Sequence, residues 1–108
     1  MSQGSGDYRH TAANLRSGAI LQRVRQELGR QTPKDNRFHA LSQAEFGALL
    51  GAKLGTDAPI QSTISQWEGG RASVPAATLI AALQLLGDGP VAEELLRDLK
   101  RSWQPIAA

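Results

Sequence analysis

The sequence contains no cysteine among its 108 residues, which excludes a disulfide framework, a cysteine-based zinc site and a cysteine nucleophile. The absence of cysteine agrees with a reducing cytoplasm, where we expect the protein to act. No apolar run approaches the roughly 20 residues of a membrane-spanning helix, and the N-terminal residues lack the apolar core of a signal peptide. We therefore expect neither membrane insertion nor secretion.

The residue patterns that usually accompany catalysis or cofactor binding are also missing. The sequence has no paired carboxylates with supporting residues, no glycine-rich phosphate loop and no cluster of metal ligands. Ser65 has no histidine near it in the sequence that would activate it as a nucleophile, because the two histidines are His10 and His39. We expect a protein that is not an enzyme and that binds no cofactor or metal ion.

The net charge of +2 is too small to indicate nucleic-acid binding by itself, but the charge is unevenly distributed. Residues 1–40 contain seven Lys or Arg residues against three acids, a net of +4, whereas residues 41–108 contain five against seven, a net of −2. The basic part of the chain could face phosphates while the acidic part faces away.

Helical periodicity of apolar residues is the main structural signal, and no segment alternates as a strand would. The fold class is therefore predicted to be all-α. Four of the five predicted helices are Asn14–Leu28, Leu41–Leu50, Ser73–Leu86 and Pro90–Trp103. The third lies in the stretch Pro59–Arg71 and is predicted to stop at Gly69 and Gly70, because glycine accepts the left-handed conformation at a helix end.

The connections between these helices are of different kinds. Residues 30–40 contain Pro, Asn and Asp without a clear period and are predicted to form a loop. Residues 51–58 either extend the second helix to about Leu54 or form an extended turn, and the sequence does not decide between them. Residues 14–103 are predicted to form one domain, with flexible tails over residues 1–13 and 104–108.

Local signals mark where several helices begin. Ser42 is a predicted N-cap, and Glu45 three residues later completes a capping box. Gly47 costs about 1 kcal/mol relative to alanine in a helix interior, so a glycine there indicates that another helix crosses close by. Asn14 is the predicted N-cap of the first helix, and Ser73 is that of the fourth. Either Thr56 or Asp57 is predicted to cap the third helix.

The third helix combines an apolar face with an uncharged polar face. Ile60, Ile64 and Trp67 fall at i, i+4 and i+7 and form the apolar face. Glutamine can bond adenine through two hydrogen bonds, and serine can donate to or accept from several base edges. The segment alone fits two interpretations equally well, a helix that reads DNA or an amphipathic helix packed on a core. The polar face consists of Gln61, Ser62, Ser65 and Gln66.

Three segments, in this order after a first helix, resemble the helix-turn-helix family of phage repressors, Cro proteins and related bacterial regulators. They read L-S-Q-A-E-F-G-A-L-L-G from residue 41, I-Q-S-T-I-S-Q-W-E-G-G-R from residue 60 and V-P-A-A-T-L-I-A-A-L from residue 74. The resemblance covers residues 14–87. The sequence departs from the family pattern in three places. Residues 30–40 form an insertion of 11 residues, and the connection between the second and third helices is seven residues longer than the short turn of typical members. In addition, Ile60 occupies the position of the usual polar N-cap of the recognition helix.

The resemblance implies a five-helix, repressor-like domain that binds double-stranded DNA and regulates transcription. Members typically bind an inverted-repeat operator as a homodimer, each copy placing its recognition helix in the major groove. It further implies a bacterial or phage-encoded protein associated with the nucleoid. The base-reading positions it assigns are Gln61, Ser62, Ser65 and Gln66. The backbone-contacting positions are Gln43, Thr63 and Arg71, to which we add the basic insertion residues Arg30, Lys34 and Arg37.

Two further expectations concern the framework of this domain. The resemblance implies an ion pair between Arg25 and Glu68 that fixes the first helix against the recognition helix. The last helix, Pro90–Trp103, is the expected dimer surface, with a stripe that consists of Leu95, Leu96, Leu99 and Trp103.

The alternative function is a helical protein-interaction module, such as an antitoxin or an adaptor, that keeps the fold with little or no base readout. The third helix has no acidic residue before Glu68, which favours DNA because nothing there repels phosphate. It also has no Lys or Arg before Arg71, so affinity for DNA must come from other parts of the surface.

Overall fold

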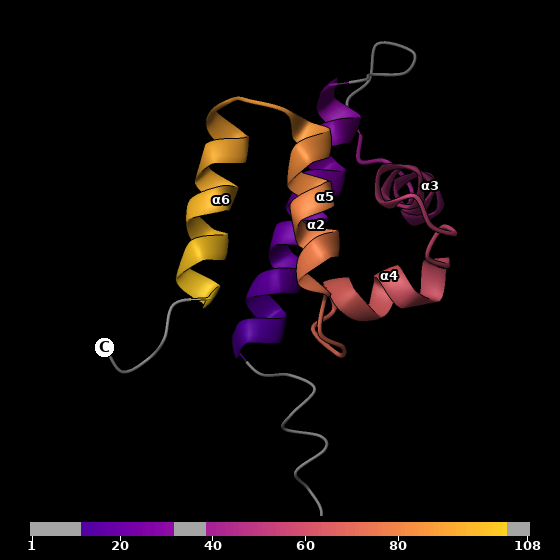
Figure 1. Ribbon diagram of the computed structural model, residues 1–108, viewed down its shortest axis with the longest axis horizontal. Coiled ribbons are helices and arrows are strands. Elements are labelled where there is room, and N and C mark those ends of the chain that lie inside the picture. Colours follow the sequence, from indigo (N-terminus) through magenta and orange to yellow (C-terminus); the bar gives the residue numbers. More distant parts are fainter. Residues whose placement is uncertain (1–11, 32–38, 104–108) are drawn as a thin grey trace, which may run out of the picture.

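The computed structural model describes residues 12–31 and 39–103, with side chains up to residue 101. Within these ranges the chain forms five α-helices and no strand, which confirms the predicted all-α, five-helix domain (Figure 1). None of the described helices is both long and apolar enough to cross a membrane. The helices are α2 (Ala12–Gln31), α3 (Gln43–Leu54), α4 (Gln61–Glu68), α5 (Ala76–Leu86) and α6 (Pro90–Trp103).

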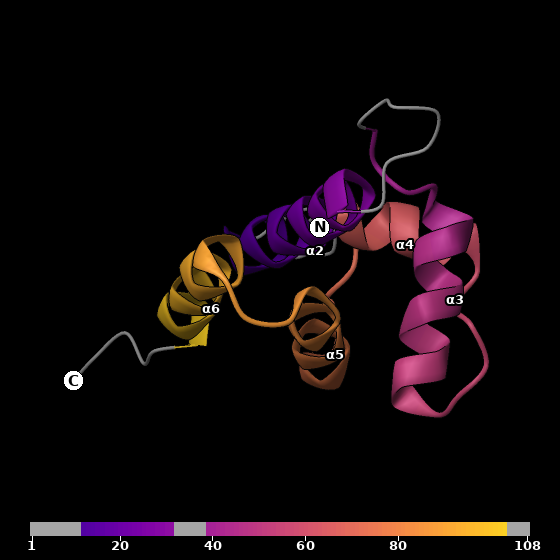
Figure 2. The same cartoon turned by 90° about the horizontal axis from the view of Figure 1, so that it is seen from above.

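The long helix α2 lies at the centre of the arrangement and contacts α4, α5 and α6, while α3 contacts α4 and α5. Figures 1 and 2 show α6 and α3 at opposite ends of the molecule, with α4 crossing near one end of α5. All five helices contribute to one contiguous apolar core. Its fully buried large side chains are Leu21, Val24, Phe46, Leu50, Ile64, Leu79 and Leu99.

Helix α3 begins as predicted. The Ser42 Oγ accepts the backbone N–H of Glu45 at 3.0 Å, and the Glu45 Oε1 accepts the backbone N–H of Ser42 at 2.9 Å, which completes the capping box. Of the two alternatives for residues 51–58, the structure has the longer helix, which continues to Leu54 and ends at Gly55 in the left-handed conformation with φ of 71°. Leu54 thereby packs against the core.

The predicted N-caps Asn14 and Ser73 are wrong. Helix α2 already includes Ala12, and α5 begins only after Pro75, which has no side-chain capping bond. Instead the Ser73 hydroxyl donates a hydrogen bond of 2.9 Å to the Oδ1 of Asn14, which is buried. This long-range contact between the two residues replaces the local capping that their sequence context indicated.

Helix α4 begins later than predicted, and it ends at Glu68, directly before the two glycines that were predicted to stop it. It begins without a side-chain cap, since Ile60 occupies the N-cap position and the Thr56 hydroxyl bonds the Asp57 carbonyl instead. Ile60 does not belong to the predicted apolar face, because its backbone is extended (φ −75°, ψ 159°) and its side chain is 66% exposed. After the helix, Gly70 takes the left-handed conformation.

Two glycines allow the backbones of α2 and α3 to approach α4 closely. A Cβ at Gly18 would overlap the carbonyl oxygen of Trp67 and lie 2.9 Å from that of Glu68. A Cβ at Gly47 would lie 2.7 Å from the carbonyl oxygen of Pro59, which leads into α4. The close crossing predicted at Gly47 is therefore confirmed, whereas the equivalent role of Gly18 was not predicted.

Helix α6 has the predicted bounds, but its expected dimer stripe divides into two parts. Leu95 and Leu99 are only 3% and 2% exposed because they pack in the core of their own chain. They are therefore unavailable to a second molecule while the fold is intact, which corrects their assignment to a dimer surface. Leu96 is exposed, and the side chain of Trp103 lies outside the described residues.

We expect the substitution Gly18→Ala to lower the free energy of unfolding. Helix propensity alone would stabilise the variant by about 1 kcal/mol. The added methyl group must displace the Trp67 and Glu68 carbonyls, and such overpacking typically costs about 1–3 kcal/mol. Urea denaturation measures the sign, and the exposed reciprocal variant Ala19→Gly isolates the propensity term. A Gly18→Ala protein more stable than the parent would contradict the close contact.

Candidate nucleic-acid interface

The polar face predicted for the third helix is exposed in the structure. Gln61, Ser62, Ser65 and Gln66 are all exposed, and their spacing of one, four and five residues places them on the same side of α4. The opposite side is buried through Ile64 and partly buried through Trp67. The exposed face therefore presents hydrogen-bond donors and acceptors without any charged side chain between Gln61 and Trp67.

The ion pair predicted between Arg25 and Glu68 is present and has bidentate geometry. Arg25 Nε donates to Glu68 Oε2 at 2.8 Å, and Nη2 donates to Oε1 at 2.9 Å. The two side chains are 15% and 7% exposed, so water screens them little. Arg25 Nη1 also donates to the carbonyl oxygen of Leu41 at 2.7 Å. One guanidinium thus joins α2, the end of α4 and the segment that precedes α3.

Gln43 takes part in the same network, which was not predicted. Its Nε2 donates to Glu68 Oε1 at 3.2 Å, so the first turn of α3 lies against the end of α4. The Gln43 side chain remains partly exposed. The resemblance had assigned Gln43 and Glu68 separate roles, and their proximity follows only from how the two helices pack.

The predicted cationic contacts are divided between described and undescribed residues. Arg71 is exposed directly after α4, and its backbone N–H donates to the Gln66 carbonyl at 2.9 Å. Arg30 is exposed in the last turn of α2 and lies 3.6 Å from Glu27. Lys34 and Arg37 lie outside the described residues. Thr63 is only partly exposed, at the border of the polar face.

Ile60 is a surface residue for which the sequence analysis held two expectations: its place in the apolar face is wrong, whereas the N-cap position that the resemblance implied is the one it occupies. Its side chain is exposed at the start of α4, next to Gln61, and it adds an apolar group to the polar face. Pro59 is a second signal for the same boundary. A proline is tolerated where the chain enters a helix, and Ile60 beside it therefore falls at the boundary rather than within the helical stripe.

Comparison with known proteins gave no match, since no family model, curated protein or solved structure matches this chain. The resemblance to the helix-turn-helix regulators consequently rests on the quoted segments. Within residues 12–31 and 39–103, no group of three or more histidine or carboxylate side chains is placed to hold a metal ion.

We expect Glu68→Ala to destabilise the protein strongly, because it leaves the Arg25 guanidinium largely buried without its carboxylate. Breaking one side of such a buried pair typically costs about 3–5 kcal/mol. The matched control is Glu94→Ala, whose partner Arg23 lies 3.9 Å away on an exposed surface. Exposed pairs of this kind contribute less than about 1 kcal/mol.

A double-mutant cycle separates the pair from other effects of each substitution. Arg25→Met combined with Glu68→Leu should cost much less than the sum of the two single changes, because no unpaired charge remains. The measurement is the free energy of unfolding in urea for the four proteins. Additive costs would show that the two side chains do not interact in solution.

Proposed function

We propose that this protein is a sequence-specific DNA-binding transcriptional regulator that inserts α4 into the major groove. The observation that carries the proposal is the uncharged, exposed face of α4, held outward by a buried ion pair at the end of the same helix. A surface that only needed solubility would be served by charged side chains. Four neighbouring amide and hydroxyl side chains instead fit a surface that forms directed hydrogen bonds.

The chemistry of this face matches the edges of bases in the major groove, which is wide enough to admit a helix. Gln61 and Gln66 can each bond adenine through N6 and N7, and Ser62 and Ser65 can donate or accept. In the proposal, the exposed side chain of Ile60 at the start of the helix contacts a thymine methyl group. The face thereby offers both polar and apolar readout.

Contacts with the DNA backbone must supply much of the affinity, because the face itself has no positive charge. In the proposal, Gln43, Thr63 and Arg71 border the face and contact phosphates. Arg30, in the last turn of α2, adds positive charge together with Lys34 and Arg37 of the segment that follows α2 in the sequence. These contacts fix the orientation of α4 but carry no sequence information.

The network around Glu68 supports base reading by limiting how α4 moves. Arg25 holds Glu68 from α2, and Gln43 holds it from α3, so the end of α4 is fixed from two sides. Gly18 and Gly47 bring both neighbouring backbones against the same helix. A binding surface held in place before binding loses less conformational freedom on association.

We expect the double substitution Gln61→Ala and Gln66→Ala to remove much of the sequence preference without unfolding the protein, since both side chains are exposed. Selection from a random DNA pool first defines the preferred site of the parent protein. The parent should then discriminate against single-base changes by about 1–3 kcal/mol per bidentate contact, roughly fivefold to over a hundredfold. The double variant should lose this discrimination.

The matched control for that experiment is Gln22→Ala, an exposed glutamine on α2, which should leave the preference unchanged. A double variant that keeps the same preferred target would contradict base reading by α4. A parent protein that shows no salt-dependent DNA binding at all would favour the alternative function, a protein-interaction module of the same fold.

Neutralising Arg30, Lys34 and Arg37 to glutamine should weaken binding to all DNA sequences alike. Each lost phosphate contact reduces the salt dependence, d log K/d log[salt], by roughly 0.9, so the slope should fall by up to about 2.7. Titrations at several salt concentrations measure it. The control with equal charge change replaces the exposed residues Lys53, Arg97 and Arg101. An unchanged slope would show that the insertion does not contact DNA.

A further inference from the structure

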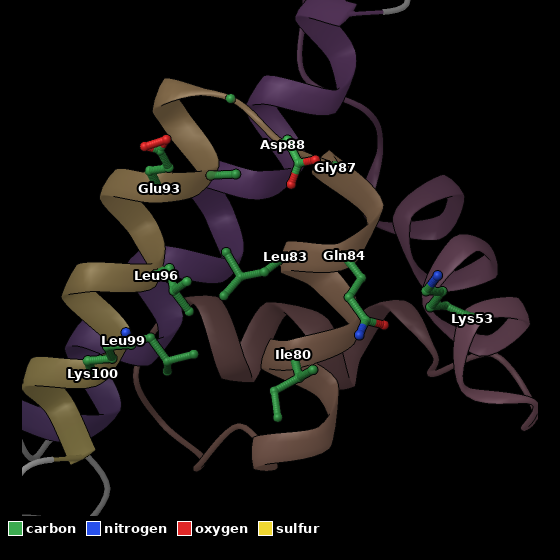
Figure 3. Close-up of a pocket in the computed structure, with 12 residues that line it drawn as sticks. Lys53, Ile80, Leu83, Gln84, Gly87, Asp88, Glu93, Leu96, Leu99 and Lys100 are labelled. Atoms are coloured by element: carbon green, nitrogen blue, oxygen red, sulfur yellow. The ribbon is translucent and has the colours of Figure 1, made fainter.

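An apolar groove of about 870 Å³ lies over α5 and α6 and reaches Lys53 at the end of α3. Its volume falls within the roughly 300–1,000 Å³ that is typical of small-molecule sites. Ile80 and Leu96 are each 44% exposed, and Figure 3 shows Leu83 and Leu96 pointing into the space between the two helices. The apolar side chains that line the groove are Ile80, Leu83, Ala92, Leu96 and Leu99.

This apolar lining favours one class of ligand. All of its side chains are aliphatic, and the described lining residues include no aromatic ring on which a planar ligand could stack. Aliphatic side chains in an open groove instead suit a flexible hydrocarbon chain, which can follow the surface between α5 and α6. The lining therefore fits an aliphatic ligand.

One side of the groove has two polar side chains that lack a partner. Lys53 lies in the last turn of α3, and Figure 3 shows Gln84 on the side of α5 that faces it. Both side chains are exposed, and neither forms an ion pair or a side-chain hydrogen bond among the described residues. The lysine ammonium and the glutamine amide both donate hydrogen bonds. Together they fit an anionic group that accepts them.

The end of the groove where α5 joins α6 has the opposite charge. Asp88 lies in the connection between the two helices, and Glu93 lies in the first turn of α6. These carboxylates repel an anion, whereas Lys53 attracts it. Lys100 is the other cation of the lining, but its neighbours there on α6 are leucines, which offer no second donor. The lining thus has one place where a carboxylate meets a positive charge and an amide together.

We propose that the groove binds an aliphatic monocarboxylate, such as a medium-chain fatty acid, from solution. The carboxylate accepts hydrogen bonds from Lys53 and Gln84, and the hydrocarbon chain lies over Ile80 and Leu83 toward Leu96. The polar and apolar halves of the ligand each meet the matching part of the lining, which fixes the direction in which the ligand lies. A bound ligand contacts α3, α5 and α6 at once.

The proposed site is separate from the polar face of α4, since no residue that lines the groove belongs to α4. The inference goes beyond the proposed contact with DNA and does not depend on it, so it is tested without DNA. A failure of ligand binding would leave the DNA contact standing, and the reverse also holds.

Isothermal titration of the full chain with decanoate, at low salt and below the critical micelle concentration, tests the proposal. We expect one binding site per chain. Shortening the ligand from decanoate to octanoate and hexanoate should weaken binding by roughly twofold per methylene, because full burial of a methylene is equivalent to about fourfold and the open groove covers about half of each. Amide NMR shifts on binding should be confined to α5, α6 and the end of α3.

Charge variants test where the carboxylate lies. Lys53→Gln should raise the dissociation constant of decanoate by about threefold to fivefold. The matched control Arg97→Gln removes the same charge at an exposed site of α6 outside the lining and should leave it unchanged. The parent should prefer decanoate to decylammonium, and Lys53→Glu should reverse that preference. Lys100→Gln should have a smaller effect than Lys53→Gln, and a larger one would overturn the proposed placement.

A pair of leucine variants tests where the hydrocarbon chain lies. Leu96→Asp puts a charge in its path and should raise the dissociation constant by about tenfold or more. The control Leu49→Asp makes the same change on α3 outside the lining, at a leucine that is 39% exposed, and should leave binding unchanged. Helical circular dichroism and cooperative melting check that each variant folds. If Leu96→Asp does not fold, the Lys53 variants and the ligand series decide.

Three results would each overturn the proposal. The first is a parent protein that does not bind decanoate. The second is a parent that binds decylammonium as tightly as decanoate, because Lys53 would then select nothing. The third is a folded Leu96→Asp protein that binds decanoate as tightly as Leu49→Asp does.

Discussion

The contact between the Arg25 guanidinium and the Glu68 carboxylate joins three segments that are distant in the sequence. A carboxylate at the last residue of a helix is unfavourable, because the helix dipole is negative there, and burial increases the cost of leaving it unpaired. Arg25 offsets both costs with two hydrogen bonds, and its third bond holds Leu41 ahead of α3. This interaction therefore holds α2, α3 and α4 together in addition to the packing of the shared core.

Helix α4 shows why such support is needed. It has eight residues and no side-chain cap, and isolated helices shorter than about 12–15 residues are marginal in water. Its stability must come from tertiary packing through Ile64, Trp67 and the close backbone contacts at Gly18 and Gly47. All of these contacts lie on its inner side. The outer side does not contribute to packing and is therefore available to bind a ligand.

Periodicity was enough to identify all five helices, and the local motifs correctly placed the Ser42 capping box and the bounds of α6. The Arg25–Glu68 pair was predicted because the resemblance implied it. Packing decided the rest. Asn14 and Ser73 bond each other across 59 positions rather than capping their own helices, and local context contains no information about that partner. Likewise, the apolar stripe on α6 predicts burial for every leucine in it. Neighbouring helices cover Leu95 and Leu99 but leave Leu96 exposed. Only the three-dimensional arrangement determines which side of a stripe meets another helix.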